Sequence, residues 1–346
     1  MPRRTLGVVV SANGYGHIRR QLLIASVLLT RDTQLRVVVG ITEGQHKRFY
    51  PELSRIGSRL TIKSGLTENS PRWHHDEKVY TDLNLCGWED EFMNCEDLYE
   101  ADFLLSDNLS GVLAYRPDAW LSGSFLWSDV LEVHATTNEA CARFTARERE
   151  LLRQHHPPMI ANQYLVTPGV SQRTQVVEVG WMIEEPLIAP KWMRSVVLIH
   201  GGGTRILDAT VMRIKSVLDD AGIQTVTDHE KDPNRFDYEE ESWSRIGLVI
   251  CRPGVGTVTE CVKWRIPILT IPDPTNNEAQ HVIDTLVSLG LARSIVDNQM
   301  TTEAALVQEV RSMFHFDVNR FEEMRRSGIH DAVNWILTAM DSAGAE

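Results

Sequence analysis

Each half of this chain contains a strand that ends in a glycine-rich turn and continues as a helix, and this pair of motifs constrains the fold most. The first copy passes through Gly14-Tyr-Gly16-His17, and the second through Arg252-Pro-Gly254-Val-Gly256-Thr257. Such a turn leaves unpaired backbone N–H groups and the positive end of a helix dipole beyond the sheet edge, where anions bind. The two copies predict two α/β domains and a cleft between them that holds an anion such as a diphosphate.

Length and charge agree with two domains and exclude some classes of partner. The 346 residues exceed one typical core and fit two domains of roughly 150 to 180 residues each. The formal net charge of −12 argues against a general nucleic-acid binder and against adhesion to an acidic membrane, because both need a basic surface. We therefore expect a small anionic ligand that a few local cations hold, and no nucleic acid.

Neither a membrane span nor a metal site is expected. The apolar run that follows the basic N-terminus ends at Ser11, and no stretch approaches the roughly 18 apolar residues of a transmembrane helix. The five cysteines are odd in number and form no Cys-x-x-Cys pair, and the histidine pairs lack a matched set of further ligands. These features predict a cytoplasmic protein without a metal site.

Short apolar runs alternate with helical patterns in the first half, as in a parallel α/β sheet. The long, polar-faced and glycine-free segment Glu132–His155 predicts helical structure. The polar, Trp-bearing stretch Leu66–Cys95 predicts a long loop or an irregular insertion, which we expect to contact the acceptor. The predicted strands are Leu6–Val10, Leu35–Val39, Leu60–Ile62, Phe103–Leu105, Ala119–Leu121, Tyr164–Val166 and Gln175–Val179.

A proline-punctuated connection over 184–190 predicts the domain boundary, with a first domain over 1–187 and a second over 188–346. A fresh α/β series then begins, and the tail Arg320–Met340 predicts one or two amphipathic helices. The predicted strands of this half are Ser195–His200, Gln224–Val226, Leu248–Cys251 and Ile268–Ile271, and the predicted helices are Ile206–Ala221, Val255–Trp264 and Glu278–Leu289.

The first glycine turn offers a candidate general base. Gly14 and Gly16 let the backbone approach a ligand, and His17 at the start of the helix carries an imidazole, the side chain that most often acts as a general base. Asp107 ends another strand and could orient the imidazole of His17. The alternatives are a helix-capping histidine and a turn aspartate, and Arg19 and Arg20 either contact an anionic ligand or are solvated.

The second half offers candidate phosphate and ribose contacts. Three consecutive glycines, Gly201 to Gly203, suit a loop that wraps phosphate oxygens, although a flexible turn remains the alternative. Glu260 lies one turn into the second glycine-motif helix, where a carboxylate can accept hydrogen bonds from a ribose diol. The candidate donor-binding residues of this half are Gly201, Gly202, Gly203, Thr204, Arg252, Gly254, Gly256, Thr257 and Glu260.

A polar loop follows the next strand, where open α/β sheets place their ligands. Its side chains, Asn277, Glu278 and Gln280, match the many donors and acceptors of a polyhydroxylated ligand. The alternative is a helix-capping loop with polar surface residues.

Together these motifs resemble the GT-B glycosyltransferases, in the branch of the peptidoglycan enzyme that forms lipid II. The resemblance rests on the Gly-His turn at His17, on Gly254-Val-Gly-Thr257-Val-Thr-Glu260, on the proline-flanked strand 266–272 and on Asn276–Gln280. It implies two Rossmann-like domains with parallel sheets that face a central cleft, and a last helix that crosses back to the first domain.

The resemblance also implies an activity: metal-independent, inverting transfer of a hexosyl group from a nucleotide diphosphate donor, with a UDP-sugar favoured. Glu260 would hold the ribose, the glycine loops with Gly14 and Gly16 the diphosphate, and Glu278 and Gln280 the sugar. His17 becomes the base with Asp107, and Arg252 or Arg205 stabilises the leaving diphosphate. The acceptor is unidentified, and no cofactor beyond the nucleotide sugar is implied.

Two other classes of function stay open. The Asn13-Gly-Tyr-Gly turn resembles the nucleotide-sugar hydrolase of pseudaminic acid synthesis, in which His17 would activate water. A catalytically silent nucleotide-sugar-binding subunit is the third reading, and the intact candidate base counts against it.

Overall fold

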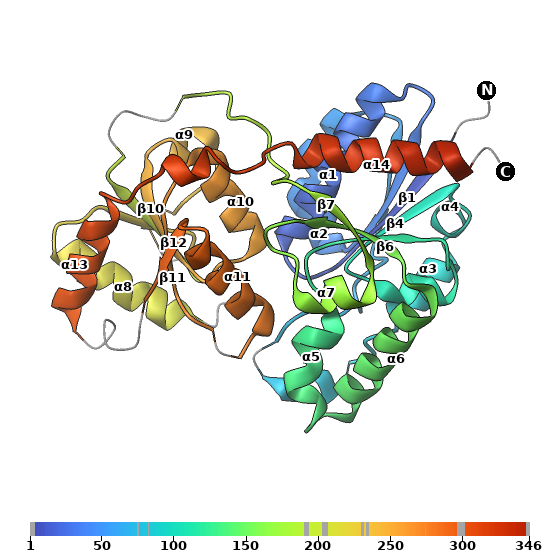
Figure 1. Cartoon of the computed structure of the whole chain (residues 1–346), viewed down its shortest axis with the longest axis horizontal. Coiled ribbons are helices and arrows are strands. Elements are labelled where there is room, and N and C mark those ends of the chain that lie inside the picture. Colours follow the sequence, from blue (N-terminus) through green and yellow to red (C-terminus); the bar gives the residue numbers. More distant parts are fainter. Residues whose placement is uncertain are drawn as a thin grey trace. The chain divides into compact units, whose positions relative to one another are not determined.

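The chain folds into two α/β units, each with its own parallel sheet (Figure 1). The computed structural model describes residues 4–74, 76–81, 83–189, 194–202, 207–229, 232, 235–273, 275–295 and 302–343. Gly203, Thr204 and Arg205 lie outside these ranges. The first unit comprises Met1–Met182 with Arg326–Glu346, and the second comprises Ile183–Arg325, so the division falls five residues before the expected boundary at 187. The expected cleft between the domains stays a prediction.

The first unit is built on a seven-stranded sheet in the order β3-β2-β1-β4-β5-β6-β7, with every neighbouring pair parallel. Successive residues of β1 point to opposite faces, so Val8 and Val10 enter one core and Val9 enters the other. The strands are β1 Thr5–Val10, β2 Arg36–Ile41, β3 Leu60–Ser64, β4 Phe103–Asp107, β5 Trp120–Ser122, β6 Pro158–Asn162 and β7 Gln175–Val179.

Helices cover both faces of this sheet. One core contains α1 and the C-terminal helix α14, whose Ile329, Val333 and Ile336 are buried at helical spacing, and Figure 1 shows α14 beside α1. The other contains the helices between β3 and β6. The helical segments are α1 Tyr15–Arg31, α2 Glu43–Ile56, η1 Glu77–Thr81, α3 Trp88–Met93, α4 Glu96–Tyr99, η2 Ser110–Ala114, α5 Trp127–Ala135, α6 Glu139–His155, α7 Pro168–Arg173 and α14 Gly328–Ala343.

One prediction for this unit is wrong, and another is confirmed with a break. The expected strand Tyr164–Val166 is a turn, because the side-chain oxygen of Asn162 accepts from Tyr164 N at 2.9 Å and its carbonyl accepts from Val166 N at 3.0 Å. The segment Glu132–His155 is helical, as expected, but it is divided between α5 and α6, because Asn138 caps a new helix by accepting from Ala140 N and Cys141 N at 3.0 and 3.1 Å.

The insertion Leu66–Cys95 is irregular, as expected, but it forms part of the core. Trp73, Tyr80, Trp88 and Phe92 are all buried in the cluster beneath the sheet. Burial of such large side chains fixes the insertion against the domain, since each buries a large apolar area. These buried side chains pack the insertion onto the unit.

The second unit has a five-stranded parallel sheet in the order β12-β11-β10-β8-β9. Its strands are β8 Val196–His200, β9 Thr225–Thr227, β10 Ile246–Cys251, β11 Ile268–Thr270 and β12 Ala292–Ser294. Its helical segments are α8 Asp208–Asp220, α9 Glu240–Trp243, α10 Val255–Trp264, α11 Asn277–Ser288, α13 Glu303–Met313 and η3 Asn319–Phe321. The expected helix over Val255–Trp264 has the observed bounds, whereas β12 and α13 have no counterpart among the expected elements.

Candidate functional site

The glycine turn of the first unit connects β1 to α1. Gly14 has a φ of +84°, in the left-handed region that favours glycine, and it precedes the helix without a side-chain cap. The turn is braced from α2, because Gln45 Nε2 donates to the carbonyls of Ser11 and Gly14 at 2.8 and 3.3 Å. The first-turn N–H groups of α1 are thus held in place without a carboxylate in that turn.

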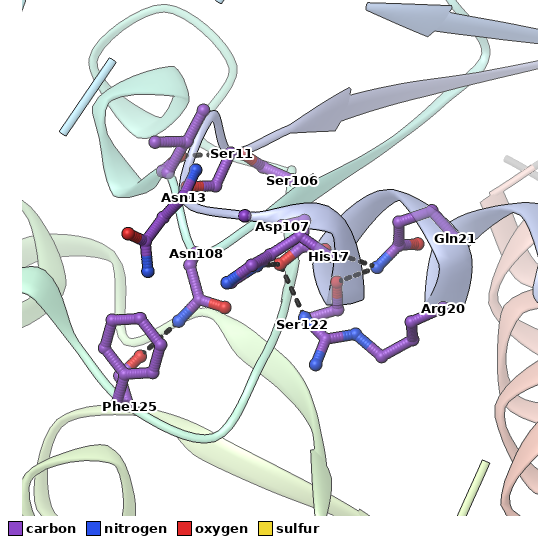
Figure 2. Close-up of polar contacts among 12 residues, drawn as sticks. Ser11, Asn13, His17, Arg20, Gln21, Ser106, Asp107, Asn108, Ser122 and Phe125 are labelled. Atoms are coloured by element: carbon purple, nitrogen blue, oxygen red, sulfur yellow. Dashed lines mark hydrogen bonds and ion pairs between the residues drawn. The ribbon is translucent and has the colours of Figure 1, made fainter. Parts of the chain in front are cut away.

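His17 and Asp107 meet at the end of this turn. His17 lies in the first turn of α1, Asp107 is the last residue of β4, and His17 Nδ1 lies 2.9 Å from Asp107 Oδ1 (Figure 2). A carboxylate only accepts hydrogen bonds, so Nδ1 carries a proton, and in the neutral ring Nε2 keeps the lone pair. The side chain of His17 is 13% exposed and that of Asp107 is fully buried. This arrangement orients an imidazole whose Nε2 can take a proton.

Two further residues of α1 hold Asp107. Arg20 Nη2 donates to Asp107 Oδ1 at 2.6 Å, the same oxygen that His17 contacts, and Gln21 Nε2 donates to Oδ2 at 3.1 Å (Figure 2). Burial alone would raise the pKa of the Asp107 carboxyl, but the positive charge of Arg20 and the hydrogen bonds from His17 and Gln21 outweigh it, so this pKa is below its ordinary value. Asp107 is therefore ionised at neutral pH. Arg20, left open in the sequence, pairs with Asp107.

The insertion contacts the same turn from the other side. Ala12 N donates to Ser70 Oγ at 3.1 Å, and Trp73 N donates to Asn13 Oδ1 at 3.2 Å. Phe125 completes the surroundings of His17, with the two rings edge to face and their centroids 6.2 Å apart. The insertion and an aromatic ring therefore lie beside the candidate base.

Asn108, which follows Asp107, adopts an unusual backbone conformation. Its φ is +56°, and its Nδ2 donates to the carbonyl of Phe125 at 2.5 Å (Figure 2). A positive φ in a residue other than glycine costs of the order of 1–3 kcal/mol and is frequent near functional sites. A backbone conformation of this kind leaves no mark in a sequence, so only the structure identifies Asn108.

Gly201 and Gly202, which follow β8, are explained by different structural requirements. Gly202 has a φ of +86°, and a Cβ there would lie 3.6 Å from Arg252 Nη1. Gly201 is buried, and a Cβ there would meet Val211 Cγ2 at 3.1 Å. Conformation and packing thus explain these two glycines, while Gly203 and Thr204 lie outside the described residues.

The second glycine turn begins α10. Gly254 precedes the helix without a side-chain hydrogen bond to its N-terminus, and Gly256 and Thr257 lie in the first turn. Among the described helices of ten or more residues, α1 and α10 alone lack an acidic residue in the first turn. Because carboxylates favour helix N-termini, their absence leaves the positive end of each dipole for another anion.

Charged residues lie both just before α10 and within it. Arg252 Nε donates to Asp273 Oδ2 at 2.6 Å, which joins the end of β10 to the segment after β11. Glu260 is buried on α10, one turn further along. The structure places Arg252, Gly254, Gly256, Thr257 and Glu260 on one strand–turn–helix segment.

The loop before α11 has a structural role as well. Asn276 Oδ1 caps the helix by accepting from Ala279 N at 2.9 Å. Asn277 and Glu278 lie in the first turn, and Gln280 Nε2 donates to Asp284 Oδ1 at 2.9 Å. The capping alternative therefore applies to Asn276, and the ligand-binding role of the other three side chains stays a prediction.

One group was missed by sequence reasoning. His200 Nδ1 lies 2.9 Å from Asp228 Oδ2, and the hydroxyl of Tyr238 donates to the same oxygen at 2.9 Å. The three residues come from the end of β8, the loop after β9 and the segment before α9. Their spacing in sequence carries no recognisable motif, so only the fold brings them together.

Both candidate regions occupy the same topological position. In the first sheet, β2 and β3 lie on one side of β1 and β4 to β7 on the other; in the second, β9 lies on one side of β8 and β10 to β12 on the other. Open α/β sheets bind ligands beyond the carboxyl ends of the strands where the order reverses. At these points Val10 pairs with Asp107, and His200 pairs with Cys251.

Other features lie away from these points. A hollow of about 990 Å³ in the first unit is lined by residues of β3 and α4, including Lys63 and Asp97, which pair at 2.6 Å. None of the predicted site residues lines it. Within the described ranges, no cluster of three His, Cys, Asp or Glu residues is arranged to hold a metal ion, and no helix is long and apolar enough to cross a membrane.

Known proteins resemble the chain in part of its sequence and in its whole fold. Residues 196–336 match the glycosyltransferase family 28 C-terminal domain. No curated protein sequence matches the chain. Among solved structures, the glycotransferase of kitacinnamycin is similar, with a TM-score of 0.70 and 15% identity over 98% of this chain and 100% of that one.

Two other similar structures contain nucleotides. UGT71G1 of Medicago truncatula, complexed with UDP-glucose, has a TM-score of 0.62 and 12% identity, and the match covers 98% of each chain. The spinosyn rhamnosyltransferase SpnG, complexed with thymidine diphosphate, has a TM-score of 0.60 and 15% identity over 97% of this chain and 100% of that one. At these identities the likeness shows the fold.

Proposed function

We propose that this chain, which has the GT-B fold and carries a glycosyltransferase family 28 C-terminal domain, is a nucleotide-sugar-dependent glycosyltransferase. In finer terms, it transfers a hexosyl group from a UDP-sugar to an acceptor hydroxyl, with inversion and without a metal ion. The observation that carries the proposal is the pairing of His17 with the buried carboxylate of Asp107 at the strand-order reversal of the first sheet. That pair supplies a general base where an α/β sheet binds its substrate.

The second unit is the proposed donor site. The N-terminus of α10 lacks both a side-chain cap and an acidic residue in its first turn, which suits a diphosphate. Gly202 and Arg252 lie beside it, so backbone N–H groups and a guanidinium can share the phosphate charge. Glu260 would accept hydrogen bonds from the ribose hydroxyls, and Asn277, Glu278 and Gln280 would contact the sugar.

The proposed reaction is a single displacement. Nε2 of His17 takes the proton of the acceptor hydroxyl as its oxygen attacks the anomeric carbon. The bond from that carbon to the diphosphate oxygen breaks, the nucleoside diphosphate leaves from the opposite face with the bonding electrons, and the anomeric configuration inverts. Ionised Asp107 stabilises the imidazolium that forms on His17.

A UDP-sugar is favoured as the donor. Similar structures were solved with UDP and with UDP-glucose, which supports a uridine nucleotide, while the thymidine diphosphate complex keeps dTDP as the second candidate. The described residues do not identify the acceptor, although the insertion packed beside His17 is its proposed contact surface.

A thermal-shift panel tests the donor proposal. UDP, dTDP, GDP and CMP, with their common sugar conjugates, are added in buffer with EDTA. A ligand at 100 times its Kd stabilises the folded chain by about 2.7 kcal/mol, so a selective rise in Tm is expected for one nucleoside diphosphate. No shift with any of them would contradict the donor role of the segment from Gly254 to Glu260.

Turnover distinguishes transfer from hydrolysis. With the donor identified, free sugar release without an acceptor would favour the hydrolase alternative, in which His17 activates water. Transfer to a supplied hydroxyl with an inverted anomer, followed by NMR, supports the transferase. His17→Ala should leave donor affinity nearly unchanged and lower kcat about 10²- to 10⁴-fold. Binding without turnover under any condition would indicate a silent subunit.

A further inference from the structure

We infer that His200 is a proton-linked cation for the donor diphosphate, binding a proton together with a nucleoside diphosphate and releasing it when the diphosphate leaves. Asp228 and Tyr238 act as positioning residues for this histidine. The inference rests on the proposed donor role of the second unit and adds a residue and a pH dependence to it.

The position of His200 supports this role. It is the last residue of β8, its carbonyl accepts from Arg252 N at 3.3 Å, and the turn of Gly201 and Gly202 follows it directly. It therefore lies at the strand-order reversal of the second sheet, beside the residues proposed for the diphosphate. Its side chain is 13% exposed, so it is positioned by its neighbours and still reachable.

The contacts of the ring indicate which nitrogen would meet a ligand. Nδ1 lies 2.9 Å from Asp228 Oδ2 and 3.3 Å from the hydroxyl of Tyr238, which itself donates to Asp228. Among the described residues, Nε2 has no hydrogen-bond partner. Because Nδ1 donates to a carboxylate, a neutral ring presents a lone pair at Nε2, and only the protonated ring can donate there to a phosphate oxygen.

The backbone of Tyr238 has an energetically unfavourable conformation. Its φ is +65°, which is rare for a residue other than glycine, and its ring packs edge to face on Phe236 with centroids 5.0 Å apart. The ring of Tyr238 also lies edge to face with His200, at 6.3 Å. Strain of this size persists where the surroundings over-determine the conformation, as at ligand sites.

Asp228 places a negative charge beside His200. Burial alone would raise the pKa of the Asp228 carboxyl. The hydrogen bond from His200, the charge of His200 and the hydrogen bond from Tyr238 outweigh the effect of burial, so the pKa of Asp228 lies below its ordinary value. Arg252, which follows β10 directly, brings a positive charge, and Asp273 pairs with it. Asp228 and a bound diphosphate together would offset the charge of a protonated His200.

The test measures UDP binding, and dTDP binding in parallel, by calorimetry from about pH 5.5 to about pH 8.5. The full chain is compared with His200→Gln and with His315→Gln, a matched control at an exposed histidine after α13. The terminal phosphate of free UDP titrates alike in every variant, so the difference between wild type and His200→Gln isolates the imidazole. Buffers of different ionisation enthalpy report the protons taken up on binding.

We expect the difference in UDP affinity between wild type and His200→Gln to depend on pH. At the acid end, His200→Gln should bind UDP about tenfold or more weakly, since charge-assisted hydrogen bonds to ligands have this magnitude, and the gap should close as pH rises. The proton uptake that comes from the imidazole, beyond the contribution of the UDP phosphate, should be lost in His200→Gln, reduced in Asp228→Asn and kept in His315→Gln. Tyr238→Phe should shift the pH at which the gap closes.

Two other results have opposite meanings. If wild type and His200→Gln bind UDP or dTDP with the same affinity and proton uptake at every pH, the role of His200 is overturned and the donor site stands. If folded wild-type protein binds neither nucleotide nor any other nucleoside diphosphate of the panel, the proposed function fails and this inference fails with it.

Discussion

At the scale of single residues, Arg20 sets the charge that the candidate base experiences. Its guanidinium and the imidazole of His17 share Oδ1 of Asp107, at 2.6 and 2.9 Å. We expect Arg20→Gln, which keeps a donor but removes the charge, to raise the pKa of the Asp107 carboxyl and to move the acid limb of the kcat/KM profile to higher pH. Arg20→Lys is the charge-keeping control. An acid limb that stays in place in Arg20→Gln would show that Arg20 does not tune the pair.

Glu260 is the residue on which the ribose prediction depends. It is buried on α10, and we expect Glu260→Ala to weaken nucleoside diphosphate binding by about 1–3 kcal/mol through loss of charged hydrogen bonds. Calorimetry with UDP and with UDP lacking the 2′-hydroxyl measures the effect. The deoxy ligand should lose less in the mutant than UDP does; equal losses would remove Glu260 from the ribose contact.

Sequence reasoning reached some of these residues and missed others for a physical reason. His17 and Asp107 each end a recognisable strand or turn, so their meeting followed from the parallel order of β1 and β4. The charge of Arg20 was visible in the sequence, but its partner depends on the side-chain direction in α1. His200 ends β8, and Asp228 and Tyr238 reach it from two segments whose conformations no local pattern encodes.

At the scale of elements, the N-terminus of α10 connects stability to binding. Its first turn contains Thr257 and no carboxylate. We expect Thr257→Asp to raise the free energy of unfolding slightly, by about 0.3–1 kcal/mol, because a carboxylate favours the dipole, and to weaken UDP binding because it repels the phosphates. Thr257→Asn is the uncharged control. If Thr257→Asp binds UDP as tightly as Thr257→Asn does, α10 does not hold the diphosphate.

The break between α5 and α6 depends on one cap. Asn138 accepts hydrogen bonds from two backbone N–H groups of α6, and we expect Asn138→Ala to lower the free energy of unfolding by about 1 kcal/mol. Asn138→Asp, which keeps the acceptor, should retain most of the stability. Urea midpoints with unchanged m-values measure both, and Asn138→Ala as stable as wild type would contradict the capping role.

Element types were more predictable than element limits. Buried apolar runs placed β1, β4, β8 and β10, because strands covered on both faces are apolar throughout. The run Tyr164–Val166 is equally apolar but follows Asn162, whose turn ends β6. Asn138 followed by Glu139 is a sequence signal for the start of a helix, but the polar helical pattern on both sides made this start hard to recognise.

At the scale of the whole molecule, the glycine motifs predicted two parallel α/β units, and each unit has its own sheet. The alternation of apolar runs with helical segments made the fold class readable. The packing of α14 on the first unit depends on long-range contacts between segments far apart in sequence. The family resemblance implied that the last helix returns to the first domain, whereas residue patterns alone indicated only an amphipathic helix.

Since the two units have separate cores, a ligand of one unit should protect that unit selectively. We expect saturating UDP to slow amide hydrogen exchange around Gly202, Asp228 and the start of α10, because binding to the native state lowers local opening, and to leave β1 to β7 nearly unchanged. Hydrogen-exchange mass spectrometry with and without UDP measures this, with Glu260→Ala at the same UDP concentration as the weak-binding control. Protection confined to the first unit would contradict the donor assignment. Protection of the segments after β8, β9 and β10 together would place the nucleotide at the strand-order reversal of the second sheet. There, Gly202, Arg252 and the first turn of α10 would bind its negatively charged diphosphate.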